Sequence, residues 1–218
     1  SSGTPELISV TIRDMQITVE DCVNGRPELI IPDELCVVAG TLIDAQVFGF
    51  DPENNKVKIE ISSDAFSLPD GPPTIYPSVE VFRNSVPYDS VRFKWQTNCS
   101  HIRDQAYQVV VKITDLPNFG AQLVAFKTWI IKIIAPAPVW KNVSLDLVNR
   151  KSILTWEPYA CTNAEVIQVW RKVGKFNYTP GECDAGLPRY LGYELAGEVS
   201  PSDTSFVDNN SSAGLVDG

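Results

Sequence analysis

The sequence contains little of what long helices, membrane spans and nucleic-acid binding require. Its 218 residues include one Met, and runs of the strong helix formers Ala, Glu, Lys and Leu are few. No apolar run approaches 18 residues, so we expect no membrane insertion by this segment. The 18 basic residues are outnumbered by 27 acidic ones, and a net charge of −9 repels phosphate backbones and anionic membranes. We therefore expect no nucleic acid as a partner.

Signatures of catalysis are also scarce. His101 lies two residues from Cys99, which suggests a Cys–His nucleophile, but no orienting acid accompanies the pair and Cys99 is expected to be oxidised. A hydrogen-bonding or solvated loop histidine is the simpler interpretation. The sequence has no Gly-x-Ser-x-Gly elbow and no Gly-rich phosphate loop. Composition leaves room for a carboxylate-pair glycosidase, but Asp and Glu stand mostly in turns. We predict that the chain is not an enzyme.

Proline, glycine and β-branched residues take the place of helix formers. The 16 Pro and 13 Gly are scattered between runs rich in Val, Ile and Thr, which favours strands and turns. Apolar residues in these runs alternate with polar ones: Val57, Ile59 and Ile61 fall on one face of a strand, and residues 107–113 alternate in the same way. A period of two is typical of half-buried antiparallel strands. The predicted fold class is all-β, with tandem β-sandwiches.

Pro-rich segments predict how the chain divides. A strand at 8–20 is expected to be the last strand of a preceding module, which covers residues 1–24. An immunoglobulin-like or cadherin-like sandwich is predicted over 25–135, followed by the stiff, extended linker Ala135-Pro136-Ala137-Pro138. Its predicted strands are 29–31, 41–50, 56–61, 79–82, 92–96, 106–115 and 122–134.

The last block, residues 136–218, resembles a fibronectin type III module. Trp156 stands where such a module keeps the core tryptophan of its strand B, and 167–171 resembles its strand C. About five strands are predicted where seven are needed: 143–148, 152–156, 166–172, 193–199 and 205–207. Strands F and G are missing from this count. We therefore expect an excerpt from a repeat array, in which residues 139–218 are not stable alone.

Five strings along the chain carry a resemblance to a known family. They are Arg13-Asp14-Met15-Gln16-Ile17, Cys36-Val37-Val38-Ala39-Gly40-Thr41, Phe93-Lys94-Trp95-Gln96-Thr97-Asn98-Cys99-Ser100-His101-Ile102-Arg103, Leu154-Thr155-Trp156-Glu157-Pro158-Tyr159-Ala160-Cys161 and Trp170-Arg171-Lys172-Val173-Gly174. Together they resemble the very large modular surface proteins of Bacteroidetes that are associated with gliding motility and exported by the type IX secretion system. The resemblance covers almost all of the chain. It implies an extracellular stalk or adhesin at the cell surface, with cadherin-like or immunoglobulin-like repeats before fibronectin-III-like ones, and no catalytic residue.

Five cysteines in an extracellular β protein predict a disulfide framework. In a Greek-key sandwich whose first strand runs down, the loops beside Cys36 and Cys99 lie at one pole, which predicts a Cys36–Cys99 bridge. Cys161 precedes a strand and Cys183 lies in the long loop after it, which predicts a Cys161–Cys183 bridge. Cys22 is left over. Free buried thiols are the alternative, and a zinc site is disfavoured because the sequence has no Cys-x-x-Cys and a single His.

Acidic turns are expected at the pole that faces the preceding module. The turn 51–55 follows one upward strand, Asp115 follows another, and Asp21 lies in the segment that enters this pole. Carboxylate and amide oxygens are the ligands of calcium, and cadherin-like repeats bind interdomain calcium at this pole. By that analogy the candidate calcium ligands are Asp51, Asn54, Asp115 and Asp21. Ordinary turns are the alternative, because Asp, Pro and Asn are turn residues.

One exposed aromatic residue is a candidate ligand contact. Trp170 lies on the face of its strand opposite Ile167 and Val169, so we expect it to be partly exposed beside Arg171. Such a ring stacks on a sugar or a neighbouring module, and covering an adjacent strand is the alternative. The sequence thus predicts a non-catalytic structural or adhesive surface module, whose partners are neighbouring modules and surface glycans or proteins. The rival functions are a carbohydrate- or receptor-binding ectodomain module and an accessory domain of a secreted hydrolase.

Overall fold

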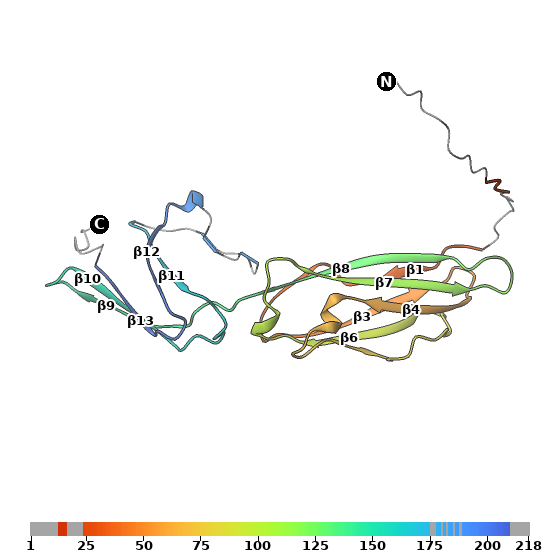
Figure 1. The fold of residues 1–218 in the computed structure, drawn as a ribbon, viewed down its shortest axis with the longest axis horizontal. Coiled ribbons are helices and arrows are strands. Elements are labelled where there is room, and N and C mark those ends of the chain that lie inside the picture. Colours follow the sequence, from red (N-terminus) through yellow and green to blue (C-terminus); the bar gives the residue numbers. More distant parts are fainter. Residues whose placement is uncertain are drawn as a thin grey trace, which may run out of the picture.

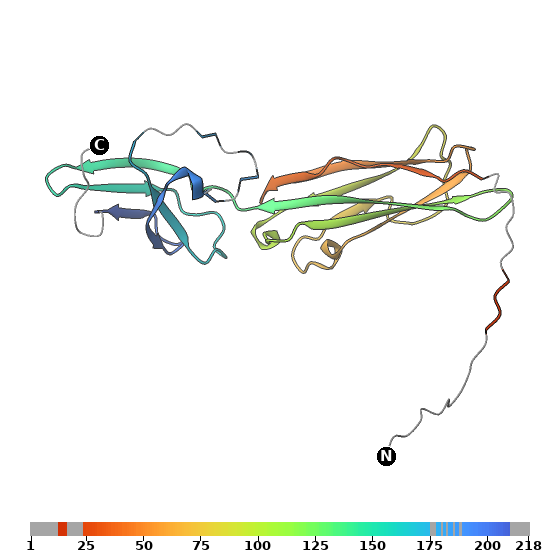
Figure 2. The ribbon, with the colours of Figure 1, turned by 90° about the horizontal axis from the view of Figure 1, so that it is seen from above.

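The computed structural model shows two β-sandwich domains end to end, seen from perpendicular directions in Figures 1 and 2. It describes residues 13–16, 24–174, 178–179, 181, 183–184, 186–187 and 189–209. Besides strands, these residues form the short 3₁₀ helices η1 (Asp64–Ser67), η2 (Cys99–His101) and η3 (Arg189–Leu191). The all-β prediction is confirmed. In the part of the chain described, no helix is long and apolar enough to cross a membrane.

The first domain packs two four-stranded sheets against each other. One sheet has the order β1-β3-β6-β5 and the other the order β2-β8-β7-β4. Neighbouring strands are antiparallel, except that β2 runs parallel to β8. The strands are β1 (Glu28–Ile30), β2 (Leu35–Val38), β3 (Leu42–Phe50), β4 (Lys56–Ser62), β5 (Thr74–Tyr76), β6 (Asp89–Gln96), β7 (Tyr107–Leu116) and β8 (Val124–Ile134).

The alternating sequence pattern produces the core between these sheets. In β4, Val57, Ile59 and Ile61 are buried, whereas the residues between them are partly exposed. Phe93 of one sheet meets Trp129 of the other edge to face, with ring centroids 5.4 Å apart. Burial of each large apolar side chain stabilises the fold by about 1.5–3 kcal/mol. The first domain therefore has an extensive core of its own.

The second domain has a much smaller core among the described residues. Its two sheets have the orders β13-β10-β9 and β11-β12. Its buried apolar residues are Trp156, Cys161, Val169 and Leu191. The strands are β9 (Trp140–Asp146), β10 (Lys151–Trp156), β11 (Ile167–Arg171), β12 (Glu194–Val199) and β13 (Ser205–Asp208). Within the described part of this domain, β11 pairs with β12 and has no strand along its other edge.

Most predicted strands agree with the observed ones to within three residues. The strand predicted at 79–82 is wrong, because Val79 and Val81 stay exposed and β5 lies beside β6 instead. The short parallel strand β2 was not predicted. The strand predicted over 8–20 lies outside the described residues except for 13–16, which form no strand.

Candidate functional site

Two disulfides join the two domains. Cys36 of β2 is bonded to Cys183, which lies between β11 and β12. Cys99 of η2 is bonded to Cys161, which lies between β10 and β11. The polypeptide crosses between the domains at 135–139, where no strand forms. Three covalent links therefore hold the two domains together: the backbone at 135–139 and the two disulfides. Together they restrict both bending and rotation of one domain against the other.

The predicted pairs Cys36–Cys99 and Cys161–Cys183 are wrong, although the four cysteines are the ones that bond. Cys36 and Cys99 are associated with different sheets, because β2 pairs with β8 whereas η2 follows β6. Packed sheets lie about 10 Å apart. A disulfide needs Cα atoms about 4.4–6.8 Å apart, and the observed pairs have Cα distances of 6.0 and 5.4 Å. The prediction failed because it paired cysteines only within a domain. Cys22 lies outside the described residues.

Hydrogen bonds supplement the covalent links at the joint. The side-chain amide of Asn163 donates to the carbonyl oxygen of Cys99 at 3.0 Å, beside the Cys99–Cys161 disulfide. The hydroxyl of Tyr159 donates to the carbonyl oxygen of Pro136 in the linker at 2.8 Å. Burial raises the pKa of the Tyr159 hydroxyl, so the group stays a neutral donor. These contacts tie the β10–β11 segment to the first domain and to the linker.

His101 is a structural residue that shapes the turn holding Cys99. Its Nδ1 accepts from the backbone N–H of Asn98 at 3.1 Å, and its Nε2 contacts the carbonyl oxygen of Asp70. A carbonyl only accepts, so Nε2 carries the proton and neither ring nitrogen is free to act as a base. The Asn98 side chain completes a capping box at η2. The histidine is hydrogen-bonded and fully buried, as opposed to solvated, and the bonded sulfur of Cys99 is no nucleophile.

Asp51 and Asp115 are linked at one pole of the first domain through hydrogen bonds of Asn24 and Asn55. The Nδ2 group of Asn24 contacts the carboxylate of Asp115, and its Oδ1 accepts from Asn55 Nδ2 at 3.3 Å. The backbone N–H of Asn55 donates to Asp51 Oδ1 at 2.9 Å. We call these four residues, Asn24, Asp51, Asn55 and Asp115, the entry pole. The sequence pattern predicted that Asp51 and Asp115 lie at the same pole, but it did not predict the linking hydrogen bonds of Asn24 and Asn55.

The entry pole is built largely as a hydrogen-bonded turn. Asp51 Oδ1 also accepts from the N–H of Glu53 at 3.0 Å, and Asp115 Oδ1 accepts from the N–H of Leu123 at 2.6 Å. Asn54 is exposed in a left-handed turn position with φ of 61°. Asp21 lies outside the described residues. Among the described residues, no three His, Cys, Asp or Glu side chains are grouped to hold a metal ion. The predicted calcium ligands are therefore only partly brought together.

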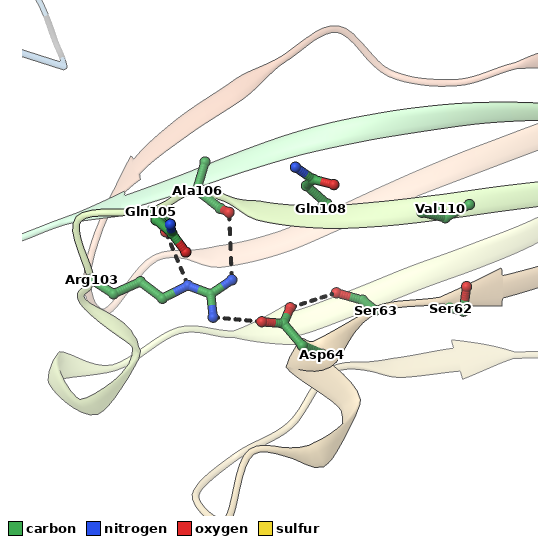
Figure 3. Close-up of a pocket in the computed structure, with 8 residues that line it drawn as sticks. All are labelled: Ser62, Ser63, Asp64, Arg103, Gln105, Ala106, Gln108 and Val110. Atoms are coloured by element: carbon green, nitrogen blue, oxygen red, sulfur yellow. Dashed lines mark hydrogen bonds and ion pairs between the residues drawn. The ribbon is translucent and has the colours of Figure 1, made fainter. Parts of the chain in front are cut away.

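A polar pocket of about 480 Å³ lies between η1 and the start of β7 (Figure 3). Its centre is Arg103, which donates to Asp64 at 2.6 Å and to the carbonyl oxygen of Gln105 at 3.0 Å. The guanidinium also lies over the ring of Tyr107, 3.5 Å from its centroid. The hydrogen bond from Arg103 lowers the pKa of Asp64. The charges of this pocket are thus paired with each other.

A tryptophan groove of about 180 Å³ lies in the second domain beside the linker; it is lined by Ala137, Pro138, Trp140, Trp156, Ile167, Gln168, Val169 and Trp170. Trp170 is 40% exposed and Trp140 59% exposed, so the predicted exposure of Trp170 is confirmed. Arg171 is not presented to this groove as a free cation, because its guanidinium pairs with Asp208 at 2.7 Å. The groove combines flat apolar rings with the side-chain amide of Gln168, whose Nε2 donates to Glu198 Oε1 at 2.8 Å. That combination suits a ligand with both apolar and hydrogen-bonding faces.

No protein-family model and no curated protein matches this chain. Among solved structures, the SrpA adhesin from Streptococcus sanguinis is similar over 64% of this chain and 72% of that one, with 18% identity and a TM-score of 0.37. Titin domains A168–A170 align over 85% of this chain and 56% of theirs, with 11% identity and a TM-score of 0.34. The sialic acid binding region of an adhesin of Streptococcus sanguinis SK1 aligns over 68% and 51%, with 11% identity and a TM-score of 0.34. Similarities this low support no argument about function.

Proposed function

We propose that this chain is a non-catalytic structural module of a large secreted or cell-surface protein that takes part in adhesion. The observation that carries the proposal is the pair of disulfides between the two β-sandwiches. Structural disulfides form and persist in oxidising, extracellular environments. A joint with three covalent links is suited to a stalk that must keep its shape outside the cell.

The finer assignment is to the gliding-associated surface proteins that the type IX secretion system exports in Bacteroidetes. It is supported by the resemblance that the five strings named above carry together. Neighbouring modules of the same parent chain are its direct partners under this proposal. The single histidine is occupied in the η2 cap, which agrees with a role other than catalysis.

Surface labelling of intact cells tests the proposed location. Antibodies against the first domain are expected to label cells of the source organism without permeabilisation. Protein released from those cells is expected to give disulfide-linked peptides 36–183 and 99–161 when it is mapped without reduction. Labelling that requires permeabilisation, together with alkylatable thiols at all four of these cysteines, would refute the proposal.

Glycan binding at the tryptophan groove is a second candidate function. It is favoured by the two exposed rings, Trp140 and Trp170, which line the groove together with the Gln168 amide. On a glycan array the 218-residue chain is expected to bind a saturable ligand. Trp170→Ala should then weaken binding about tenfold, because an aromatic contact contributes about 0.5–1.5 kcal/mol beyond its buried area. Phe119→Ala, which removes an 84% exposed ring from the first domain, is the matched control. An array without a saturable ligand rejects this function.

A further inference from the structure

The two interdomain disulfides are nested along the chain. Cys36–Cys183 spans a sequence separation of 147 residues, and Cys99–Cys161, with a separation of 62, lies inside that loop. The outer loop contains every strand from β3 to β11. It therefore encloses most of the first domain and three strands of the second.

We propose that the Cys36–Cys183 disulfide is a bypass that carries mechanical tension around strands β3 to β11. A pull on the two ends of the chain reaches Cys36 along the backbone and crosses the S–S bond directly to Cys183. The enclosed strands are then off the covalent path that bears the load. They cannot be extended while the bond is intact, even if their hydrogen bonds break.

The placement of the strands shows what the bypass protects. The strands that bury Phe93, Trp95 and Trp129 lie inside the outer loop. Outside it lie β1, which pairs with β3 over three residues, and the strands β12 and β13. Among the described strands, only these outer ones can peel away under tension. Because the two ends of the bond lie in different domains, the bypass also keeps the domains together.

This inference rests on the proposed function, because the disulfide carries load only when the chain is part of a surface stalk under tension. The length of chain that each disulfide loop holds back follows from chain geometry. An extended chain spans at most about 3.3–3.6 Å per residue. The outer loop therefore withholds about 500 Å of extension and the inner loop about 200 Å. Breaking the outer bond alone releases the difference, about 300 Å.

Single-molecule stretching of the whole 218-residue chain between handles at its two ends tests this arrangement. Every protein in the set carries Cys22→Ser, which removes the fifth cysteine and its capacity for thiol exchange. The Cys36→Ser/Cys183→Ser variant is expected to unfold to a contour length about 300 Å longer than that of the oxidised parent. The Cys99→Ser/Cys161→Ser variant is the matched control. It also loses one interdomain disulfide, but it should gain no length because its loop lies inside the outer one.

Two results would overturn the bypass. One is a gain in length for Cys99→Ser/Cys161→Ser, and the other is no gain for Cys36→Ser/Cys183→Ser. If a variant does not fold, the parent with and without reductant decides, because reduction should add about 500 Å. An oxidised parent that extends to its full contour length contradicts the proposal. These outcomes are independent of cell labelling, so a failed bypass and a failed surface assignment are distinguishable.

Discussion

The two carboxylate oxygens of Asp51 have different surroundings at the entry pole. The side chain is only 2% exposed, and its Oδ1 accepts from two backbone N–H groups. Its Oδ2 is buried without a hydrogen-bond partner among the described residues. A buried carboxylate oxygen is costly unless something compensates its charge. Asp51 is therefore the residue at which we test the predicted binding of calcium.

We expect millimolar calcium to raise the melting temperature of the chain, because a ligand of the folded state alone stabilises it. Extracellular modules bind calcium with dissociation constants of about 10⁻⁴–10⁻³ M. In Asp51→Asn the calcium-dependent rise should disappear, whereas Asp203→Asn, in the second domain, should keep it. Differential scanning calorimetry in chelator and in calcium gives the comparison within each protein. Equal melting temperatures for the parent in both buffers would mean that the entry pole is an ordinary turn.

Glu60 on β4 bridges two lysines on the outer face of its sheet. Its Oε2 lies 2.9 Å from Lys112 Nζ and 3.3 Å from Lys58 Nζ. The hydrogen bond from Lys112 is the main cause that lowers the pKa of Glu60 below its ordinary value of 4.5. A lowered pKa in the folded state stabilises the fold above the unfolded-state pKa. That contribution is lost as the pH falls through the folded-state pKa.

Glu60→Gln is therefore expected to reduce the free energy of unfolding by about 0.5–1 kcal/mol at pH 7. The difference from the parent should shrink as the pH falls below about 4.5, because the parent carboxylate is then protonated too. Urea unfolding at several pH values measures both effects. Glu80→Gln is the control, because Glu80 is exposed and belongs to none of the ion pairs found in the described residues. If the difference in free energy of unfolding between Glu60→Gln and the parent did not change with pH, the loss of stability would come from packing and not from charge.

At the scale of single elements, the long alternating strands were predictable. Of the short ones, β1 and β13 were predicted, whereas β2 and β5 were not. β4, and β7 as far as Ile113, bury every second side chain, so their sequence carries the period of the structure. β2 and β5 have four and three residues, too few to show a period. The disulfide pairs depend on which loops of two domains face each other. That information lies in tertiary placement and in no local pattern.

In the described part of the second domain, one edge of β11 carries no strand, and such an edge favours association. β11 pairs only with β12 in the described part of the second domain, and apolar side chains of β9 such as Val143 and Leu145 are mostly exposed. An open edge beside an apolar face favours pairing with another strand. We expect the 218-residue chain to associate as its concentration rises, as measured by sedimentation velocity.

A lysine placed on this edge should weaken that association, because a charge opposes strand addition. Gln168→Lys introduces it on β11, at an exposed position. Gln108→Lys is the matched control, since Gln108 is also exposed but lies on β7, which has a strand on each side. Equal association of both variants and the parent would mean that β11 is not the site. A chain that stays monomeric throughout would mean that the edge is protected.

At the scale of the whole molecule, the disulfides join a domain with an extensive core to a domain with a small one. The core of the first domain includes Trp95, Trp129 and Phe93, whereas the second relies on few buried apolar side chains. Cys161 and Cys183 attach the second domain to the first at two points besides the linker. These attachments restrict its unfolded conformations, and a disulfide typically stabilises by about 2–4 kcal/mol. A loss of that size is a large fraction of the stability of a domain with little core.

Reduction is therefore expected to unfold the second domain while the first stays folded. Hydrogen exchange followed by mass spectrometry should show β9 to β13 losing protection in reductant, while β3, β6, β7 and β8 keep theirs. The double variant Cys99→Ser/Cys161→Ser should lie between the oxidised and reduced proteins, since one attachment remains. The disulfides act by reducing the conformational entropy of the unfolded chain. Re-forming them by reoxidation should therefore restore protection. If both domains lost protection together, the joint would be cooperative and the second domain would not depend on its tethers alone.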